Sequence, residues 1–307
     1  MKQHFLQSTV WEEFQHALGN ETIRRDGDGW SYLAIVEHAG GLTRLYCPYG
    51  PTAMSLENLD AAITSLRTEA KKLGAAFLRV QPFPMLLTGN DTDTRGMRAI
   101  RYSQPEATRV IDLSPSLEEI ISTMSQSKRS VIRNYQNKGL AYRVSKDPAD
   151  VETLLPLLHD IAERNRILVH DDDYIRKQAK VLIPEHGSLH FIDLDGTAIS
   201  GAFAFEDATT VYYAHAGTAA EHYKLQANTA LVGELIAYAK NLGKKTFDLY
   251  GVAPNDDPNH PWSGVTGFKA GFGGEMALYN QTYDIPLQKA RYHLYEALRS
   301  IKKLVRK

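Results

Sequence analysis

The sequence AKKLG at residues 70–74, followed by the apolar run AFLRV at residues 76–80, has a counterpart later in the chain. Residues 239–243 read AKNLG and precede TFDLY at residues 246–250, so residue 239 repeats residue 70 after 169 positions. In each copy a glycine ends a helical pattern and a β-prone run follows. The sequence therefore predicts two related units, each with a helix leading into a strand, that enclose a cleft.

The elements around these copies mix strands and helices. Alternating β-prone runs precede each copy, and in the second half they form a meander over residues 189–215. Such meanders packed with helices predict an α+β, or loosely α/β, fold rather than a doubly wound sheet. We expect a first domain over residues 1–146, a second over 147–285, and a separate basic helix over 286–307.

The C-terminal segment has a cationic amphipathic pattern. Leu294, Leu298, Ile301 and Val305 follow one another at spacings of four, three and four, and most Lys and Arg residues fall elsewhere on the helix circumference. Two partners fit this pattern. The apolar stripe could pack on the protein's own core, or it could contact the anionic inner leaflet of a membrane.

Composition excludes several classes of protein. The 307 residues are 43% hydrophobic and 23% charged with a formal net charge of −1, which is typical of a globular domain and not of a disordered or strongly basic chain. The one cysteine, Cys47, excludes an intramolecular disulfide framework and a cysteine-based zinc cluster. The N-terminus lacks the apolar run of a signal peptide, and no stretch of about 20 apolar residues occurs. We therefore expect a cytoplasmic protein.

Several stretches, taken in order along the chain, resemble the FemABX family of peptidyltransferases. These stretches are FLRVQP at residues 77–82, SKR at 127–129 with GL at 139–140, YAHAGT at 213–218, TFDLYGV at 246–252 and GFKAGFGGE at 267–275. The resemblance implies two acetyltransferase-like (GNAT) domains in the compact form that lacks a helical arm. It also implies transfer of an amino acid from aminoacyl-tRNA to an amine of a lipid-linked or nucleotide-linked peptidoglycan precursor, with no metal and no bound cofactor.

The resemblance assigns catalysis to Phe268 and Lys269, where a fixed cation in a glycine-punctuated segment suits oxyanion or phosphate stabilisation. The alternative is a surface lysine before a turn. Compact relatives usually carry a carboxylate at the position of Gln81, and an amide cannot act as a general base. Either the substrate then supplies its own base, or the acceptor substrate differs from that of those relatives. Arg79 is a candidate anion contact, or else a surface charge at the end of a strand.

The same resemblance implies substrate contacts from Tyr174, His170, His215 and Tyr213. His170 stands where relatives carry a cation, and His215 where they carry an aromatic hydroxyl, so both could instead be hydrogen-bonded structural imidazoles. Four cations, Lys128, Arg129, Arg133 and Lys138, lie within eleven positions without an intervening acid. They are candidates for binding tRNA phosphates, or they could simply form a solvated helix face.

Two other functions fit the same sequence. One is GNAT-type N-acyl transfer from acyl-CoA, although neither half shows a Gln/Arg-x-x-Gly-x-Gly/Ala pyrophosphate loop before a helix. The other is a non-catalytic scaffold that binds muropeptides, for which Gln81 is the motivating residue.

Overall fold

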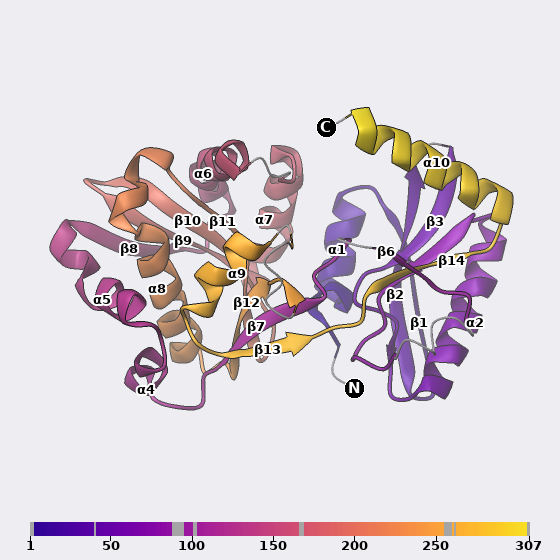
Figure 1. Cartoon of the computed structure of the whole chain (residues 1–307), viewed down its shortest axis with the longest axis horizontal. Coiled ribbons are helices and arrows are strands. Elements are labelled where there is room, and N and C mark those ends of the chain that lie inside the picture. Colours follow the sequence, from indigo (N-terminus) through magenta and orange to yellow (C-terminus); the bar gives the residue numbers. More distant parts are fainter. Residues whose placement is uncertain are drawn as a thin grey trace. The chain divides into compact units, whose positions relative to one another are not determined.

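The computed structural model describes residues 3–39, 41–87, 95–100, 103–165, 169–254, 260 and 262–305. These residues form two compact units (Figure 1). Unit 1 comprises Met1–Glu106 together with Leu278–Lys307, and unit 2 comprises Ala107–Ala277. No helix in the described ranges is both long enough and apolar enough to cross a bilayer.

Unit 1 is built on a mixed sheet. Its elements are η1 (Phe5–Gln7), α1 (Thr9–Ala17), β1 (Glu21–Gly27), β2 (Trp30–Ala39), β3 (Leu42–Cys47), β4 (Thr52–Ala53), α2 (Leu56–Lys72), β5 (Phe77–Val80), β6 (Arg98–Ile100), β14 (Thr282–Pro286) and α10 (Lys289–Val305). The strand order is β1-β2-β3-β5-β14-β6, with β4 beside β2. β3 and β5 are parallel, and α2 connects them.

The boundaries of α2 follow from local chemistry. The hydroxyl of Ser55 caps the helix by accepting from the backbone N–H of Asn58, and Gly74 ends it in the left-handed region at φ 63°. The buried face of α2, which includes Leu59 and Leu66, packs into the same core as Leu78 of β5. On the other face of β5, Phe77 contacts Tyr292 of α10 at 5.2 Å between ring centroids.

Unit 2 has a second mixed sheet with helices on both faces (Figure 1). Its elements are β7 (Ala107–Asp112), α4 (Leu117–Ser122), α5 (Gln126–Asn134), η2 (Tyr135–Lys138), β8 (Leu140–Ser145), η3 (Pro148–Asp150), α6 (Val151–Asn165), α7 (Asp172–His186), β9 (Gly187–Leu194), β10 (Thr197–Glu206), β11 (Thr210–Thr218), η4 (Ala220–Leu225), α8 (Ala227–Asn241), β12 (Thr246–Gly251), α9 (Ser263–Ala270) and β13 (Glu275–Leu278). The strand order is β13-β7-β12-β11-β10-β9-β8.

The predicted repeat is a parallel strand–helix–strand crossover in each unit. In unit 2, α8 connects the parallel strands β11 and β12, as α2 connects β3 and β5 in unit 1. Gly243 ends α8 at φ 71° in the same left-handed conformation as Gly74. The fold is thus a mixed α+β duplication, as the sequence predicts.

Each sheet also contains a strand that follows the crossover of the other repeat. β14 comes after β12 in sequence but pairs with β5 in unit 1. β7 comes after β5 in sequence but pairs with β12 in unit 2. The chain therefore leaves unit 1 after Glu106 and returns to it at Leu278.

The division differs from the expected boundaries at residues 146 and 285. Residues 107–146 belong to unit 2 because β7 pairs with β12, β8 pairs with β9, and Ile120 and Val131 lie in the unit 2 core. The basic helix α10 is part of unit 1, where Tyr292 is fully buried. Strand pairing between distant segments leaves no local mark in composition, so the sequence does not reveal this exchange.

Candidate active site

Lys269 is a buried cation near the end of α9. Its side chain is 7% exposed, and its ammonium donates to the carbonyl of Gly251 at 2.8 Å. Burial lowers the pKa of Lys269 to about 8, and the negative charge of Asp248 opposes this shift. A positive charge kept out of water and fixed at a strand end is suited to stabilising a developing oxyanion.

The strand end that anchors Lys269 has an unusual backbone. Tyr250 has φ 65°, and the pairing of β12 with β7 shifts register between Asp248 and Gly251. The Asp248 carboxylate accepts from the backbone N–H of Tyr250 at 2.7 Å and from the hydroxyl of Thr108. Asp248 therefore ties down this strand end and so positions the carbonyl that Lys269 contacts.

The two parallel strands of unit 2 lose their pairing near this point. Within the described residues, β11 and β12 pair only from Thr210↔Thr246 to Tyr212↔Asp248, although β11 continues to Thr218. A β-bulge follows on the β10 side of β11, between Tyr213 and His215. In unit 1 the equivalent pair stays aligned through Cys47↔Val80, the last residues of both strands. Among the described residues, therefore, the strands joined by a crossover helix stop pairing before their ends only in unit 2, where β12 continues to Gly251, the residue that Lys269 contacts.

Lys128 lies between aromatic rings and not on a solvated surface. Its ammonium is 3.9 Å from the ring centroid of Phe268 and 4.6 Å from that of Phe272, and it donates to the hydroxyl of Thr229 at 3.1 Å. Desolvation lowers the pKa of Lys128 to about 8. Phe268, predicted as catalytic, therefore holds a second cation one residue from Lys269.

His170, Tyr174 and His215, three of the residues that the resemblance implies as substrate contacts, lie together. The rings of His170 and Tyr174 stack at 3.9 Å, and His170 meets His215 edge-on at 5.9 Å. His215 hydrogen-bonds through Nε2 to the amide oxygen of Gln178 at 2.8 Å, which makes Nε2 the protonated nitrogen.

Both imidazoles border an apolar cavity of about 190 Å³. Side chains of α6, of α7 and the segment just before it, and of β11 complete its lining: Leu158, Ile161, Val169, Ile175, Ala214 and Ala216. Desolvation lowers the pKa of His215 to about 3, and repulsion from His170, once that ring is protonated, acts in the same direction. Desolvation also lowers the pKa of His170, against the charge of Asp171. Two neutral rings therefore face this cavity at neutral pH.

Tyr213 belongs to the hydrophobic core of unit 2 and does not line that cavity. Burial raises the pKa of its phenol. The bulge in β11 separates its environment from that of His215, two residues further on.

Gln81 has a structural task in unit 1. Its amide nitrogen donates to the carbonyls of Pro105 at 3.1 Å and Asn280 at 2.9 Å, and the side chain is fully buried. Its amide oxygen is buried without a hydrogen-bond partner in the described part of the chain. A carboxylate could not donate these two bonds, which gives a physical reason for an amide at this position. Gln81 and Lys269 belong to different units, so their meeting in one site stays a prediction.

Arg79 forms a buried ion pair and does not offer its charge to a ligand. Its guanidinium donates to both carboxylate oxygens of Asp284, at 2.7 and 2.9 Å, and Tyr292 donates to the same carboxylate at 3.1 Å. Burial lowers the pKa of Arg79, but the hydrogen bonds and charge of Asp284 more than offset this effect and raise it. Neither interpretation of the sequence, anion contact or surface charge, describes this arrangement.

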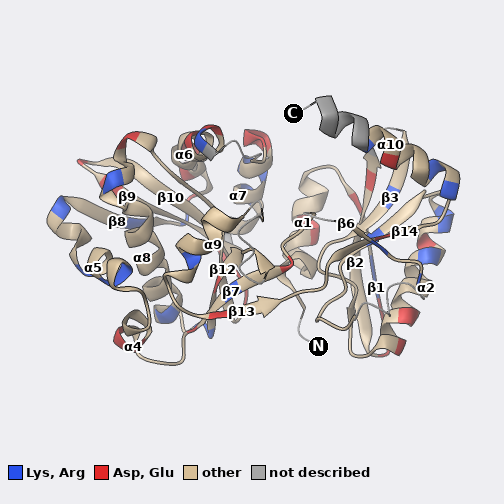
Figure 2. Cartoon of the chain, viewed as in Figure 1, with Lys and Arg blue, Asp and Glu red and all other residues tan. Residues whose placement is uncertain are grey.

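The predicted basic patch is divided among several contacts. Arg129 donates to the carbonyls of Ser122 and Met124, and Arg133 pairs with Glu118 on α4. Lys128 is in the aromatic cage described above. Lys138 is exposed at the end of η2. Figure 2 shows blue cations along α5.

The partners that position these residues cannot be found by sequence reasoning. Thr229 holds Lys128 from 101 residues away, and Asp284 pairs with Arg79 from 205 residues away. No spacing rule connects such pairs. The sequence distinguishes Gly217 only as part of the YAHAGT stretch at residues 213–218, yet a Cβ there would lie 2.1 Å from the carbonyl oxygen of Leu157 in α6. A glycine inside a strand is the one available sign of that close approach.

Comparison with known proteins links the second half of the chain to one family. Residues 185–300 match the FemAB family, and this range contains β11, β12, α9 and Lys269. The chain is 25% identical over 188 residues to the aminoacyltransferase FemA of Staphylococcus epidermidis, a match that covers 61% of this chain and 42% of FemA. The match thus spans less than half the length of that relative.

Solved structures share the fold over nearly the whole chain. A crystal structure of FemX superposes with a TM-score of 0.80 at 17% identity, covering 95% of this chain and 94% of that one. A tandem GNAT protein from the clavulanic acid biosynthesis pathway superposes with a TM-score of 0.54 at 12% identity, covering 85% of this chain and 81% of that one. Two GNAT-like domains therefore describe the architecture.

Proposed function

We propose, from the premise that this chain belongs to the FemAB family, that it is an aminoacyltransferase acting in the formation of peptidoglycan bridges. In the proposed reaction, an amino acid moves from aminoacyl-tRNA to the amine of a peptidoglycan precursor peptide. The observation that carries this proposal is Lys269, a buried ammonium at the point where β11 and β12 separate.

The proposed reaction needs no covalent intermediate with the protein. The neutral amine attacks the ester carbonyl, a C–N bond forms, and the C–O bond to the tRNA ribose breaks. The amine proton passes to the leaving ribose oxygen, so the substrate supplies the base that Gln81 cannot provide. The protein has to orient the two reactants and stabilise the tetrahedral oxyanion.

Lys269 suits the oxyanion role because only one of its three N–H bonds has a partner in the described structure, the carbonyl of Gly251. The two remaining protons are available to an oxygen that gains negative charge. Asp248 keeps the ammonium form favoured against burial. Lys128, caged by Phe268 and Phe272, adds a second positive charge to the same helix end.

The direct test is transfer of radiolabel from charged tRNA to a lipid-linked or nucleotide-linked muropeptide. Lys269→Ala should lower the rate about 100-fold or more, the usual effect of removing one oxyanion contact. Lys180→Ala, which removes an exposed lysine of α7, is the matched control and should keep the wild-type rate. Equal transfer by wild type and Lys269→Ala would remove Lys269 from the mechanism.

Two rival functions predict different results. An acyl-CoA-dependent transferase would show a thermal shift with CoA, which the proposed enzyme should not. A non-catalytic scaffold would bind muropeptide but show no turnover with any charged tRNA. The fixed role of Gln81 in holding Pro105 and Asn280 explains the missing carboxylate without invoking a lost reaction, and so favours the enzyme.

Helix α10 supports a peripheral contact with the inner membrane leaflet as part of this proposal. Leu294 is 56% exposed and Leu298 is 44% exposed, while Tyr292 on another face is buried. Leu294 and Leu298 therefore do not pack on the core of unit 1, whereas Tyr292 does. A helix with exposed leucines between lysines and arginines suits an anionic lipid surface, where a lipid-linked acceptor would lie. Cosedimentation with phosphatidylglycerol vesicles should weaken in Leu294→Ser/Leu298→Ser.

A further inference from the structure

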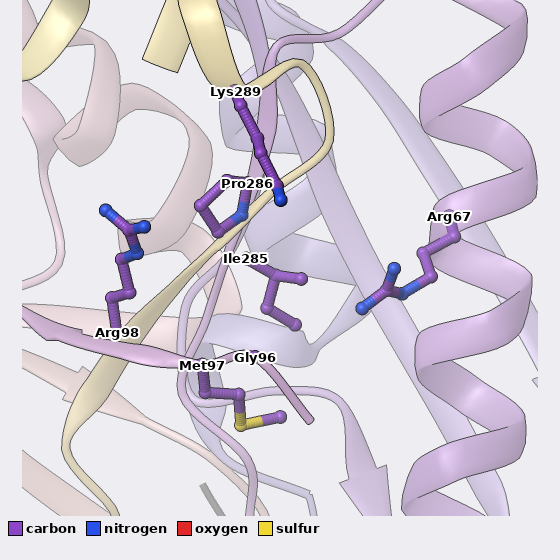
Figure 3. Close-up of a pocket in the computed structure, with 7 residues that line it drawn as sticks. All are labelled: Arg67, Gly96, Met97, Arg98, Ile285, Pro286 and Lys289. Carbon is purple, nitrogen blue, oxygen red and sulfur yellow. The ribbon is translucent and has the colours of Figure 1, made fainter. Parts of the chain in front are cut away.

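A second cavity, of about 460 Å³, lies in unit 1 among α2, the turn before β6 and the start of α10 (Figure 3). Its volume is in the range of small-molecule sites. Met97, Ile285 and Pro286 give it an apolar lining. All of these residues belong to unit 1, whereas Lys269 and the His170–His215 cavity belong to unit 2.

Two cations from different helices point into this space. In Figure 3 the guanidinium of Arg67 on α2 and the ammonium of Lys289 on α10 both extend toward Ile285. Arg98 also lines the cavity, but it lies 3.5 Å from the carboxylate of Glu296 and 5.4 Å from the ring centroid of Tyr292. Arg67 and Lys289 are therefore the charges left to meet a ligand.

These two cations contrast with most others in unit 1. Six of the others pair with carboxylates: Arg24–Glu12, Arg25–Glu69, Lys72–Glu69, Arg44–Glu37, Arg79–Asp284 and Arg95–Asp60. Arg67 has one hydrogen bond, to the carbonyl of Arg95 at 3.5 Å, and no ion pair within the described ranges. No described carboxylate lines the cavity. Its positive charge is thus uncompensated by the protein residues that the structure places there.

We propose that this cavity binds a phosphate-bearing group, a phosphate or pyrophosphate carried on an apolar moiety. The arginine fork matches two phosphate oxygens, and the lysine adds a point charge from another helix. The apolar part of the ligand would contact Met97, Ile285 and Pro286. This site goes beyond the proposed aminoacyl transfer and does not depend on it.

The test is isothermal titration of the full chain with inorganic pyrophosphate, then with geranyl pyrophosphate. Arg67→Gln and Lys289→Gln should each weaken pyrophosphate binding about tenfold or more. Lys72→Gln, which removes a 62% exposed cation from the same helix as Arg67, is the matched control and should bind like wild type. Circular dichroism should show the same unfolding midpoint for all variants, because neither cation lies in the core.

Absence of saturable pyrophosphate binding, or an equal loss in Lys72→Gln, would overturn the site. Geranyl pyrophosphate should bind at least several-fold tighter than pyrophosphate, and equal affinities would overturn the apolar half of the proposal. Vesicles containing phosphatidic acid identify the source of the phosphate. If they compete with pyrophosphate in wild type but not in Arg67→Gln, the ligand is a lipid headgroup; if they do not compete, it is a soluble phosphate compound.

Discussion

Two lysines of unit 2 are kept in surroundings that disfavour their charge. Lys269 is buried against Gly251, and Lys128 lies between two phenylalanine rings. Lowering the pKa of Lys269 from 10.5 to about 8 corresponds to a cost of about 3 kcal/mol in the native state at neutral pH. A protein rarely retains such a cost without a use for the charge, which is why these residues centre the candidate site.

The charge state of Lys269 predicts the alkaline limit of the reaction. If the ammonium form is active, the rate of aminoacyl transfer should fall as pH rises through about 8, because Lys269 loses its proton there. Lys269→Arg, if it transfers at all, should keep its rate to higher pH. Lys128→Met controls for the second lysine and should retain the limit. Initial rates of transfer from pH 6 to pH 10 locate the pH at which the activity falls. A rate that rises through pH 8 would contradict the oxyanion role of Lys269.

The sequence identifies several residues of the candidate site but not the residues that they contact. Motifs identify His170, Tyr174 and His215, and these three residues do lie together. The sequence leaves Arg79 as either an anion contact or a surface charge, and it is neither, because it forms a buried ion pair with the protein's own Asp284. A motif identifies a residue type at a position, whereas its partner depends on tertiary contacts across about 100 to 200 residues.

At the scale of elements, α6 rests directly on the backbone of β11. Gly217 permits this, since a Cβ there would lie 2.1 Å from the Leu157 carbonyl oxygen and 2.3 Å from its carbon. The same strand contributes His215 to the cavity and carries the bulge. Packing of α6 on β11 therefore shapes the cavity as well as the core.

Gly217→Ala should destabilise unit 2 by about 2 kcal/mol or more, because a helix backbone cannot yield as a side chain can. Gly264→Ala in α9 is the matched control, since nothing lies within 4 Å of a Cβ at that position. It should leave stability unchanged or raise it by up to about 1 kcal/mol. Urea unfolding followed by circular dichroism measures both. Similar midpoints for the two variants would show that α6 adjusts readily.

Strand β9 adds a buried polar network on the same sheet. His190 is fully buried and accepts at Nδ1 from Tyr142 at 2.8 Å, while its Nε2 lies 2.7 Å from the hydroxyl of Ser188. Ser188 in turn donates to Glu206 at 2.6 Å. Desolvation lowers the pKa of His190 to about 3, and the charge of Lys146 acts in the same direction.

This network predicts acid sensitivity. Below pH 6.5 the unfolded chain protonates His190 and His215, but the native state does not until about pH 3. Stability present above pH 6.5 is therefore lost as pH falls toward 3, by about 1.4 kcal/mol per pH unit for each histidine. His215→Gln should flatten the dependence, and His16→Gln, at an exposed site, should not. Urea midpoints from pH 7 to pH 5 measure the slope, and equal slopes in all three proteins would contradict the assignment.

At the scale of the whole molecule, the exchange of β7 and β14 makes the two units unequal. Unit 2 is one continuous segment, whereas unit 1 needs β14 between β5 and β6. β14 contributes Tyr283 and Ile285 to the unit 1 core. Residues 1–106 alone would leave that core open.

A fragment of residues 107–277 should therefore fold cooperatively, while residues 1–106 should not. A polypeptide that joins residues 1–106 to 278–307 through a short glycine-serine linker should restore a cooperative transition. Thermal unfolding followed by circular dichroism, together with amide dispersion in NMR spectra, shows whether each polypeptide folds cooperatively. A folded 1–106 fragment, or an unfolded joined chain, would show that β14 is not needed in the way described.

The sequence predicts the duplication but not the domain boundaries. The AKKLG and AKNLG copies share a local pattern, a helix end followed by a strand, which short-range rules capture. The placement of β14 and β7 depends on pairing across about 200 and 140 residues, which no local rule captures. For α10 the sequence does not reveal which face meets unit 1: Leu294 and Leu298 are exposed, and Tyr292 contacts Phe77 of the sheet.

Because unit 1 is completed only by residues from Leu278 onward, its folding must wait for the end of synthesis on the ribosome. Translation proceeds at about 5 to 20 residues per second, so β14 emerges on the order of ten seconds or more after β6. During that interval the nascent N-terminal sheet exposes the edge of β5, while the inserted segment can complete its own core. Unit 2 should therefore mature first, and holdase chaperones should engage the waiting residues 1–106 until the last thirty are made.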